Sequence, residues 1–149
     1  MLKDIYNFLQ LTDKLSSSGM PTKEQLADIA NAGVQVVINL ALPTSEKALP
    51  NESALVESLA MKYIGIPVEW DQPTSENLKE FIRAMDAHRD QRVHVHCQAN
   101  YRAIAFITLY RIERLGWKQE EAFKDLRRIW NPDEYPIWRK FIEDNLSTR

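Results

Sequence analysis

A single cysteine and a nearby arginine are the residues best suited to chemistry in this sequence. Cys97 ends the run Val93-His94-Val95-His96-Cys97, and Arg102 follows after four further residues. A thiolate is a strong nucleophile, and a guanidinium matches two oxygens of a tetrahedral anion. A loop that joins a strand end to a helix start presents backbone N–H groups, which favour both an oxyanion and a thiolate. The spacing therefore predicts an oxyanion held by Arg102 beside a nucleophilic Cys97.

Other uses of the same residues need to be weighed. One cysteine excludes an intramolecular disulfide and a cysteine-rich metal site. A lone cysteine is often only a small buried hydrophobe. His94 and His96 share one face of the expected strand, but the neighbouring sequence offers no third protein ligand, so we expect no metal and no cofactor.

Strand patterns and helix patterns alternate along the chain. Apolar residues at helical spacing and capping residues predict helices within 22–33, 52–61, 74–88, 102–115, 118–130 and 133–146. Runs rich in Val and Ile predict strands at 34–40, 63–68 and 92–96, and residues 16–22 are expected to form a turn-rich segment. The alternation indicates one α/β domain over residues 1–149, with a mostly parallel central sheet flanked by helices in three layers. In such sheets ligands bind beyond the carboxyl ends of the strands, which is where Cys97 lies.

Composition limits the function classes. The chain has 149 residues, of which 44% are hydrophobic and 27% charged, as in an ordinary soluble domain. A net charge of −2 gives no electrostatic case for nucleic acid, and no apolar stretch approaches the roughly 20 residues that span a bilayer. Residues 1–11 do not resemble a signal peptide, which favours the cytoplasm; a periplasmic location would require a leader that had been cleaved.

Several motifs resemble one known family. His96-Cys97 followed by Arg102 resembles the phosphate loop of protein tyrosine and dual-specificity phosphatases. The segments that precede this loop have the same order as in the bacterial phosphatase group named for its fusion to beta-lactamase-like hydrolases: Ser18-Gly19-Met20-Pro21-Thr22 with Gln25-Leu26, then Val37-Ile38-Asn39-Leu40, then Ile66-Pro67-Val68. The resemblance covers roughly residues 5–115. It implies a dual-specificity phosphatase-like fold and metal-free hydrolysis of a phosphate monoester through a cysteinyl-phosphate.

The resemblance also implies a role for each matching residue. Cys97 would attack phosphorus, and Asp71 would protonate the leaving oxygen and then activate water. His96 would brace the loop by hydrogen bonding, and Asn39 would do the same from beneath. Glu69 is the other candidate acid, but Asp71 stands just before a helix, as the role requires. The phosphate oxygens would bind Arg102 and the loop amides of Gln98, Ala99, Asn100, Tyr101 and Arg102.

The loop departs from the family pattern in two respects. It has four residues between Cys97 and Arg102 where the family has five, and it lacks glycine. Asn100 is the residue best able to adopt a left-handed conformation in place of glycine. Ala103 follows Arg102 where the family has Ser or Thr, so that position offers no hydroxyl to help the thiolate leave.

Two other functions therefore stay open. A four-residue spacing resembles the loop of rhodaneses, which carry sulfur on cysteine as a persulfide; Asp71 argues against this, because sulfur transfer needs no general acid. A module that binds phosphate or a phosphorylated partner without turnover is the other. The expected partner is in each case a phosphorylated substrate or a small oxyanion, and the sequence leaves the natural substrate and the oligomeric state open.

Overall fold

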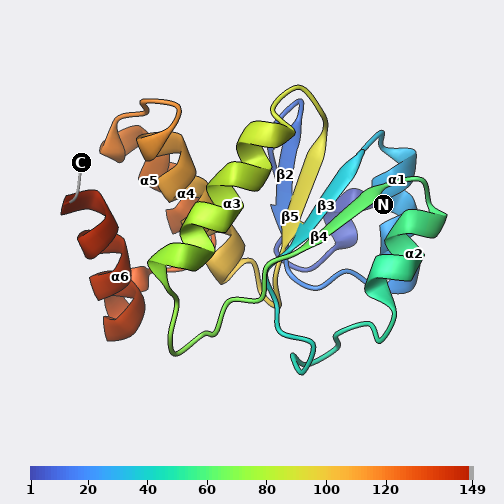
Figure 1. The fold of residues 1–149 in the computed structure, drawn as a ribbon, viewed down its shortest axis with the longest axis horizontal. Helices are drawn as coiled ribbons and strands as arrows, with labels where there is room; N and C mark the ends of the chain where they lie inside the picture. Colours follow the sequence, from blue (N-terminus) through green and yellow to red (C-terminus); the bar gives the residue numbers. More distant parts are fainter. Residues whose placement is uncertain (148–149) are drawn as a thin grey trace.

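The computed structural model describes residues 1–147. Its elements follow one another along the chain as shown in Figure 1: η1 (Leu2–Asp4), β1 (Leu9–Thr12), β2 (Leu15–Ser18), α1 (Lys23–Asn31), β3 (Val36–Asn39), α2 (Glu52–Ser58), β4 (Lys62–Gly65), α3 (Ser75–Ala87), β5 (Val93–His96), α4 (Tyr101–Glu113), α5 (Gln119–Arg127), η2 (Pro132–Glu134) and α6 (Pro136–Ser147).

The sheet has five strands in the order β1-β2-β5-β3-β4. Strands β2, β5, β3 and β4 are parallel, and β1 runs antiparallel to β2 at one edge. In the register of the sheet, His96 lies opposite both Ser18 of β2 and Asn39 of β3. These three strands therefore end at one level, and the segments that follow them meet at the same edge of the sheet.

Helices cover both faces of the sheet (Figure 1). Helices α1 and α2 pack on one face, and α3, α4, α5 and α6 form the layer on the other. Residues of β5 alternate between the two faces: Val93 and Val95 belong to the larger core beneath α3, α4 and α6, while His94 and His96 point toward the layer of α1 and α2. The α/β architecture in three layers with a mostly parallel sheet is thus confirmed.

Helix α4 is the central helix of the larger layer. Every residue from Arg102 to Ile112 is buried, because the helix lies between the sheet and the other helices. This placement explains why its sequence is apolar nearly all round rather than on one face. The helix holds Arg102 at its first turn, directly after the loop that contains Cys97.

The N-terminal hairpin corrects one prediction. Residues 16–22 were expected to be turn-rich, but Leu15–Ser18 forms strand β2 inside the sheet, and Ser16, Ser17 and Ser18 are all buried. Serine usually disfavours a buried strand; here the hydroxyls of Ser16 and Ser18 find a buried hydrogen-bond partner in His94.

Most other elements agree with the sequence. Thr22 and Gln25 form a reciprocal capping box at the start of α1, as expected of a capping threonine. The last two helices are shorter or shifted relative to 118–130 and 133–146, since η2 separates Gln119–Arg127 from Pro136–Ser147. Within residues 1–147 no helix combines the length and the apolar character needed to cross a membrane.

Candidate active site

A pocket of about 350 Å³ opens over the loop that follows β5. The loop begins at Cys97, which is fully buried, and ends at Asn100, the N-cap of α4. The pocket brings together most of the predicted loop residues with two aromatic side chains from other segments: Trp70, Cys97, Gln98, Ala99, Tyr101, Arg102 and Tyr135. Asn100 lies behind this lining with its side chain turned into the protein.

The carbonyl groups of the loop are held on the side away from the pocket. His96 Nδ1 lies 3.3 Å from the carbonyl oxygen of Cys97, Met20 N–H donates to that of Gln98 at 2.9 Å, and the Asn7 side chain donates to that of Ala99 at 3.0 Å. All peptide bonds are trans, so the N–H of each peptide points opposite to its carbonyl. The amides of Gln98 and Ala99, opposite the first two of these carbonyls, therefore point toward the pocket that both residues line, and within residues 1–147 they make no hydrogen bond. The amides of Asn100, Tyr101 and Arg102 stay predicted donors. Amides gathered in this way form an anion-binding cradle.

Asn100 has the left-handed conformation that was predicted for it, with φ of 70°. Its side-chain N–H groups donate to the carbonyl of Asn7 at 2.8 Å and to Ser17 Oγ at 3.1 Å. Asn7 also has a positive φ, of 51°, and it returns a hydrogen bond to the loop at Ala99. The two asparagines thus lock the turn that leads into α4.

Gly19 lies against the loop from the other side. A Cβ added there would lie 2.7 Å from the carbonyl oxygen of Gln98 and 3.2 Å from Cα of Ala99, which are backbone atoms. Only glycine permits this close approach. Asn7, Ser17 and Gly19 all support the loop, and the sequence analysis assigned none of them that task.

Arg102 is buried at the base of the pocket. Its Nη1 donates to the carbonyl of Val68 at 2.8 Å, and this is the one hydrogen bond that the guanidinium makes among the described residues. The bond fixes the plane of the fork while other N–H groups remain for an oxyanion. Its role as phosphate clamp stays a prediction.

The segment after Val68 carries the two candidate acids. Glu69 and Gln72 pair across a tight turn, with Trp70 and Asp71 at its tip. Trp70 lines the pocket and its carbonyl accepts a hydrogen bond from Trp138 Nε1 at 2.8 Å. Asp71 is exposed beside Trp70 and is not among the residues that line the pocket. Its role as general acid stays a prediction.

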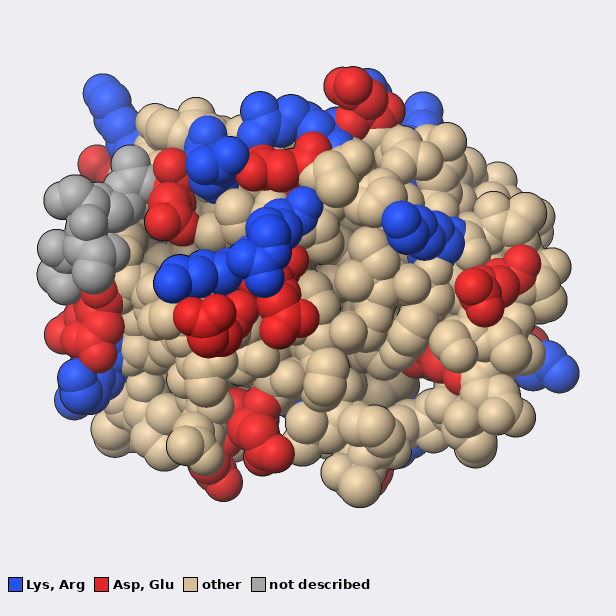
Figure 2. Space-filling view, viewed as in Figure 1, with Lys and Arg blue, Asp and Glu red and all other residues tan. Residues whose placement is uncertain are grey.

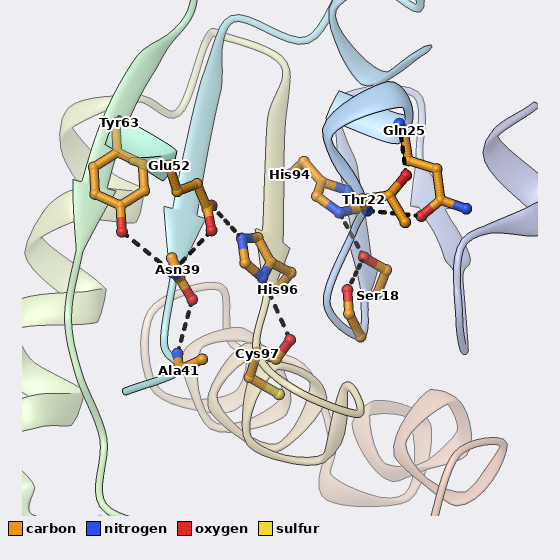
Figure 3. Close-up of polar contacts among 11 residues, drawn as sticks. Ser18, Thr22, Gln25, Asn39, Ala41, Glu52, Tyr63, His94, His96 and Cys97 are labelled. Carbon is orange, nitrogen blue, oxygen red and sulfur yellow. Dashed lines mark hydrogen bonds and ion pairs between the residues drawn. The ribbon is translucent and has the colours of Figure 1, made fainter. Parts of the chain in front are cut away.

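His96 and Asn39 were both expected to brace the loop. His96 does so through the carbonyl of Cys97, but Asn39 does not touch the loop (Figure 3). Asn39 accepts from Ala41 N–H at 2.8 Å and donates to Glu52 and Tyr63. The expectation for Asn39 is therefore wrong in its direct form, because the side chain stops at Glu52, a buried carboxylate that the sequence analysis did not single out. Burial, partly offset by the hydrogen bond from Asn39, raises the pKa of the Tyr63 hydroxyl.

The other strand histidine is enclosed by serines. His94 is fully buried, and its Nδ1 lies 2.7 Å from Ser16 Oγ. Its Nε2 lies 2.8 Å from Ser18 Oγ (Figure 3). Burial, and to a lesser extent the neighbouring His96, lower the pKa of His94 to about 3, so the ring is neutral. Both ring nitrogens are thus occupied, and residues 1–147 contain no cluster of three or more His, Cys, Asp or Glu side chains placed to hold a metal ion.

Aromatic side chains form the mouth of the pocket. Tyr101 stacks on Trp130 with ring centroids 4.7 Å apart, and Trp70 packs on Trp138 at 5.4 Å. Tyr135 meets the edges of these rings and completes the wall. Trp130, Tyr135 and Trp138 lie after residue 115, beyond the residues that carry the family resemblance.

Charge is sparse at the pocket and mixed elsewhere. Arg102 is the one charged side chain among the residues that line the pocket. On the face drawn in Figure 2, acidic and basic side chains lie interspersed over the helices, with no broad area of one sign. Positive charge at the pocket therefore comes from Arg102, with no broad basic surface on the face that Figure 2 draws.

The fold and the loop define a class of protein. A parallel sheet whose central strand ends in Cys97, a loop of inward-facing amides and Arg102 at the first turn of a helix is the arrangement of the cysteine-based phosphatases of the tyrosine and dual-specificity type. Residues 10–136 match the model of the family described as a DSP-PTPase phosphatase fused to NAD+ kinase, and the chain belongs to this family.

Known relatives agree with this assignment. A protein from Shewanella putrefaciens CN-32 that is described as a putative phosphatase (DUF442) is 36% identical, with a TM-score of 0.89 over 99% of this chain and 95% of that one. The beta-lactamase hydrolase-like protein of Xylella fastidiosa is 26% identical over 117 residues, which are 76% of this chain. The chain spans about a quarter, 27%, of the length of that relative. Pseudomonas aeruginosa TpbA is 18% identical with a TM-score of 0.75 over 93% of this chain and 84% of its own, which shows the shared fold.

Proposed function

We propose that this protein hydrolyses phosphate monoesters through a covalent cysteinyl-phosphate at Cys97. The observation that carries the proposal is the loop itself: Cys97, Gln98, Ala99 and Arg102 line one pocket, and among residues 1–147 the amides of Gln98 and Ala99 have no hydrogen-bond partner. Such donors stabilise the charge of a phosphoryl group in transit and need no rearrangement during the reaction.

The reaction proceeds in two displacements. In the first, the Cys97 thiolate attacks phosphorus, the bond from phosphorus to the leaving oxygen breaks, and that oxygen takes a proton from Asp71. In the second, water attacks phosphorus, gives its proton to the Asp71 carboxylate, and the phosphorus–sulfur bond breaks to release inorganic phosphate and the thiolate. Arg102 and the amides of Gln98 and Ala99 hold the non-bridging oxygens throughout.

The residue after Arg102 bears on the second step. Ala103 is buried and has no hydroxyl with which to assist the departing thiolate. We therefore expect breakdown of the cysteinyl-phosphate to be slow relative to its formation. A rapid initial burst of product from an aryl phosphate, followed by a slower steady rate, is the kinetic sign of this order.

The pocket walls favour an aryl phosphate such as phosphotyrosine. Trp70, Tyr101 and Tyr135 provide apolar faces on which an aromatic ring packs. Arg102 alone supplies charge there, which disfavours substrates that carry several phosphates. TpbA, which shares the fold, has been solved with phosphotyrosine in a Cys-to-Ser variant.

The test is hydrolysis of para-nitrophenyl phosphate by the purified protein beside its Cys97→Ser variant. Release of nitrophenolate that is lost in the variant, with an unchanged circular dichroism spectrum, supports the proposal. Turnover that persists in Cys97→Ser refutes Cys97 as the nucleophile. A parallel assay of sulfur transfer from thiosulfate to cyanide covers the rhodanese alternative: activity there without phosphate release would assign the short loop to sulfur chemistry. Silence in both assays from a folded protein would favour binding without turnover.

A further inference from the structure

Glu52 is a buried carboxylate that the proposed reaction does not use. It begins α2 on the face of the sheet opposite the larger core, and its side chain is 5% exposed. Its Oε2 lies 2.6 Å from His96 Nε2, and its Oε1 accepts from Asn39 Nδ2 at 3.3 Å (Figure 3). Both oxygens therefore have partners that hold the carboxylate in one orientation.

The hydrogen bonds of His96 fix where its protons lie. The carbonyl oxygen of Cys97 can only accept, so His96 Nδ1, 3.3 Å away, carries a hydrogen directed at it. The approach of Nε2 to Glu52 Oε2 at 2.6 Å requires a further proton between those two atoms. The ring is fully buried and cannot turn without losing both contacts.

The carbonyl that His96 holds belongs to the peptide that joins Cys97 to Gln98. In a planar trans peptide the N–H points opposite to the carbonyl, so a hold on the carbonyl sets the direction of the Gln98 amide. That amide is one of the two that face the pocket without another partner in the described part of the chain. If His96 moved, the rigid peptide between Cys97 and Gln98 would turn, and the Gln98 amide would move within the phosphate cradle.

We propose that Glu52 is a positioning residue that aims the Gln98 amide at the bound oxyanion by way of His96. The inference rests on the proposed phosphate site, since it assigns a purpose to one of that site's donors. Glu52 itself touches neither substrate nor the reacting atoms. Its effect is to keep the Cys97 carbonyl on the far side of the loop.

The experiment measures binding of inorganic phosphate by NMR in a Cys97→Ser background, where no turnover is needed. Glu52→Leu fills a similar volume but cannot hold His96, and it is expected to weaken phosphate binding about tenfold and to shift the Gln98 amide resonance. Glu52→Gln can donate its amide to His96 Nε2 and accept from Asn39, so binding should stay within about twofold. Glu57→Leu, at an exposed position of the same helix, is the matched control and should leave phosphate binding unchanged.

A simple role in folding predicts a different pattern. It would lower the melting temperature of Glu52→Leu while leaving the phosphate affinity of the folded fraction intact. That result would overturn the inference. A tenfold loss of phosphate affinity in Glu52→Gln would overturn it too. If Glu52→Leu does not fold, Glu52→Asp replaces it, because this variant keeps the charge but shortens the side chain by one carbon–carbon bond. Glu52→Asp should show the same tenfold loss of phosphate affinity. Full affinity in Glu52→Asp would also overturn the inference. If the Cys97→Ser protein binds phosphate but the unmodified protein shows no turnover, only the proposed reaction is refuted. If the Cys97→Ser protein binds no phosphate, both the proposed reaction and the inference on Glu52 are refuted.

Discussion

Nη1 of Arg102 donates a hydrogen bond to the carbonyl oxygen of Val68 at 2.8 Å. The residue that would grip the phosphate thus also holds the start of the turn that carries Asp71. Two residues further on, Trp138 Nε1 holds the carbonyl of Trp70 at 2.8 Å. Hydrogen bonds from the first turn of α4 and from helix α6 thus hold the turn at two points, which limits how far its tip with Asp71 can move.

Asp71→Asn tests which carboxylate is the general acid. We expect kcat/KM, which reports formation of the cysteinyl-phosphate and not its slower breakdown, to fall roughly 10²–10⁴-fold with phenyl phosphate, whose leaving oxygen needs a proton. The loss should be much smaller with para-nitrophenyl phosphate, because nitrophenolate leaves without one. Glu69→Gln, in the same turn, is the control and should stay near the parent rate with both esters. Equal losses with the two esters, or a larger effect at Glu69, would move the role away from Asp71.

Trp138→Phe tests whether the hydrogen bond from helix α6 to Trp70 positions the turn that carries Asp71. The change keeps an aromatic ring in the cluster but removes the N–H that bonds Trp70, a contact worth about 1 kcal/mol. We expect kcat to fall several-fold with phenyl phosphate while KM changes little, because the phosphate cradle is untouched. Trp117→Phe is the matched control, since Trp117 stacks on Arg111 away from the pocket. If both variants keep the parent kcat, the bond to Trp70 has no part in placing the turn.

Gly19→Ala tests the close approach behind the loop. The new Cβ would lie 2.7 Å from the Gln98 carbonyl oxygen, so the loop backbone must shift. We expect a loss of about 1–3 kcal/mol in the free energy of unfolding, as for overpacking, together with weaker phosphate binding. Gly65→Ala provides the comparison, because its nearest contacts at 3.2–3.3 Å are side-chain atoms of Tyr63. Denaturant unfolding and phosphate titration of both variants make the measurement; a Gly19→Ala protein with full stability and affinity would contradict the account.

Much of the fold and the position of the candidate site could be predicted from local patterns. The alternation of Val- and Ile-rich runs with capped helices gave the parallel sheet, and the spacing of Cys97 and Arg102 located the pocket. Strand β2 was not predicted, because a run of serines indicates a turn. Only the neighbouring strand β5 reveals that His94 provides a hydrogen-bond partner for the hydroxyls of Ser16 and Ser18.

The supports of the site lay beyond the reach of local patterns. Glu52 reads as one more acidic residue at a helix start, and nothing near it in sequence indicates that it meets His96 across 44 positions. Asn7 contacts the loop across 92 positions and Trp138 reaches Trp70 across 68. Asp71 remains a prediction, since its exposed place at the tip of the turn neither brings it into the lining nor removes it from the rim.

Substitutions of Asn100 can distinguish what its backbone conformation and its side-chain hydrogen bonds each contribute to stability. Asn100→Gly tolerates the φ of 70° but loses the bonds to Asn7 and Ser17, while Asn100→Ala loses the bonds and adds left-handed strain of about 1 kcal/mol. We therefore expect both variants to be less stable than the parent and Asn100→Ala to be the less stable of the two. Urea unfolding at one pH gives the comparison. An Asn100→Ala protein at least as stable as Asn100→Gly would show that backbone conformation is not what selects asparagine.

His94 should make the stability of the protein depend on pH. Its pKa falls from an ordinary 6.5 to about 3 in the folded state because the ring is buried and lies near His96. Between those values the unfolded chain binds a proton that the folded chain does not, so stability is highest above pH 6.5 and falls as the pH drops toward 3. At pH 5 the loss from this one group is roughly 2 kcal/mol. His94→Gln cannot titrate and should lose about that much less between pH 7 and pH 5 in urea unfolding, whatever its stability at pH 7. Equal slopes in the parent and His94→Gln would mean that the buried ring is not the group that acid must protonate to unfold the chain.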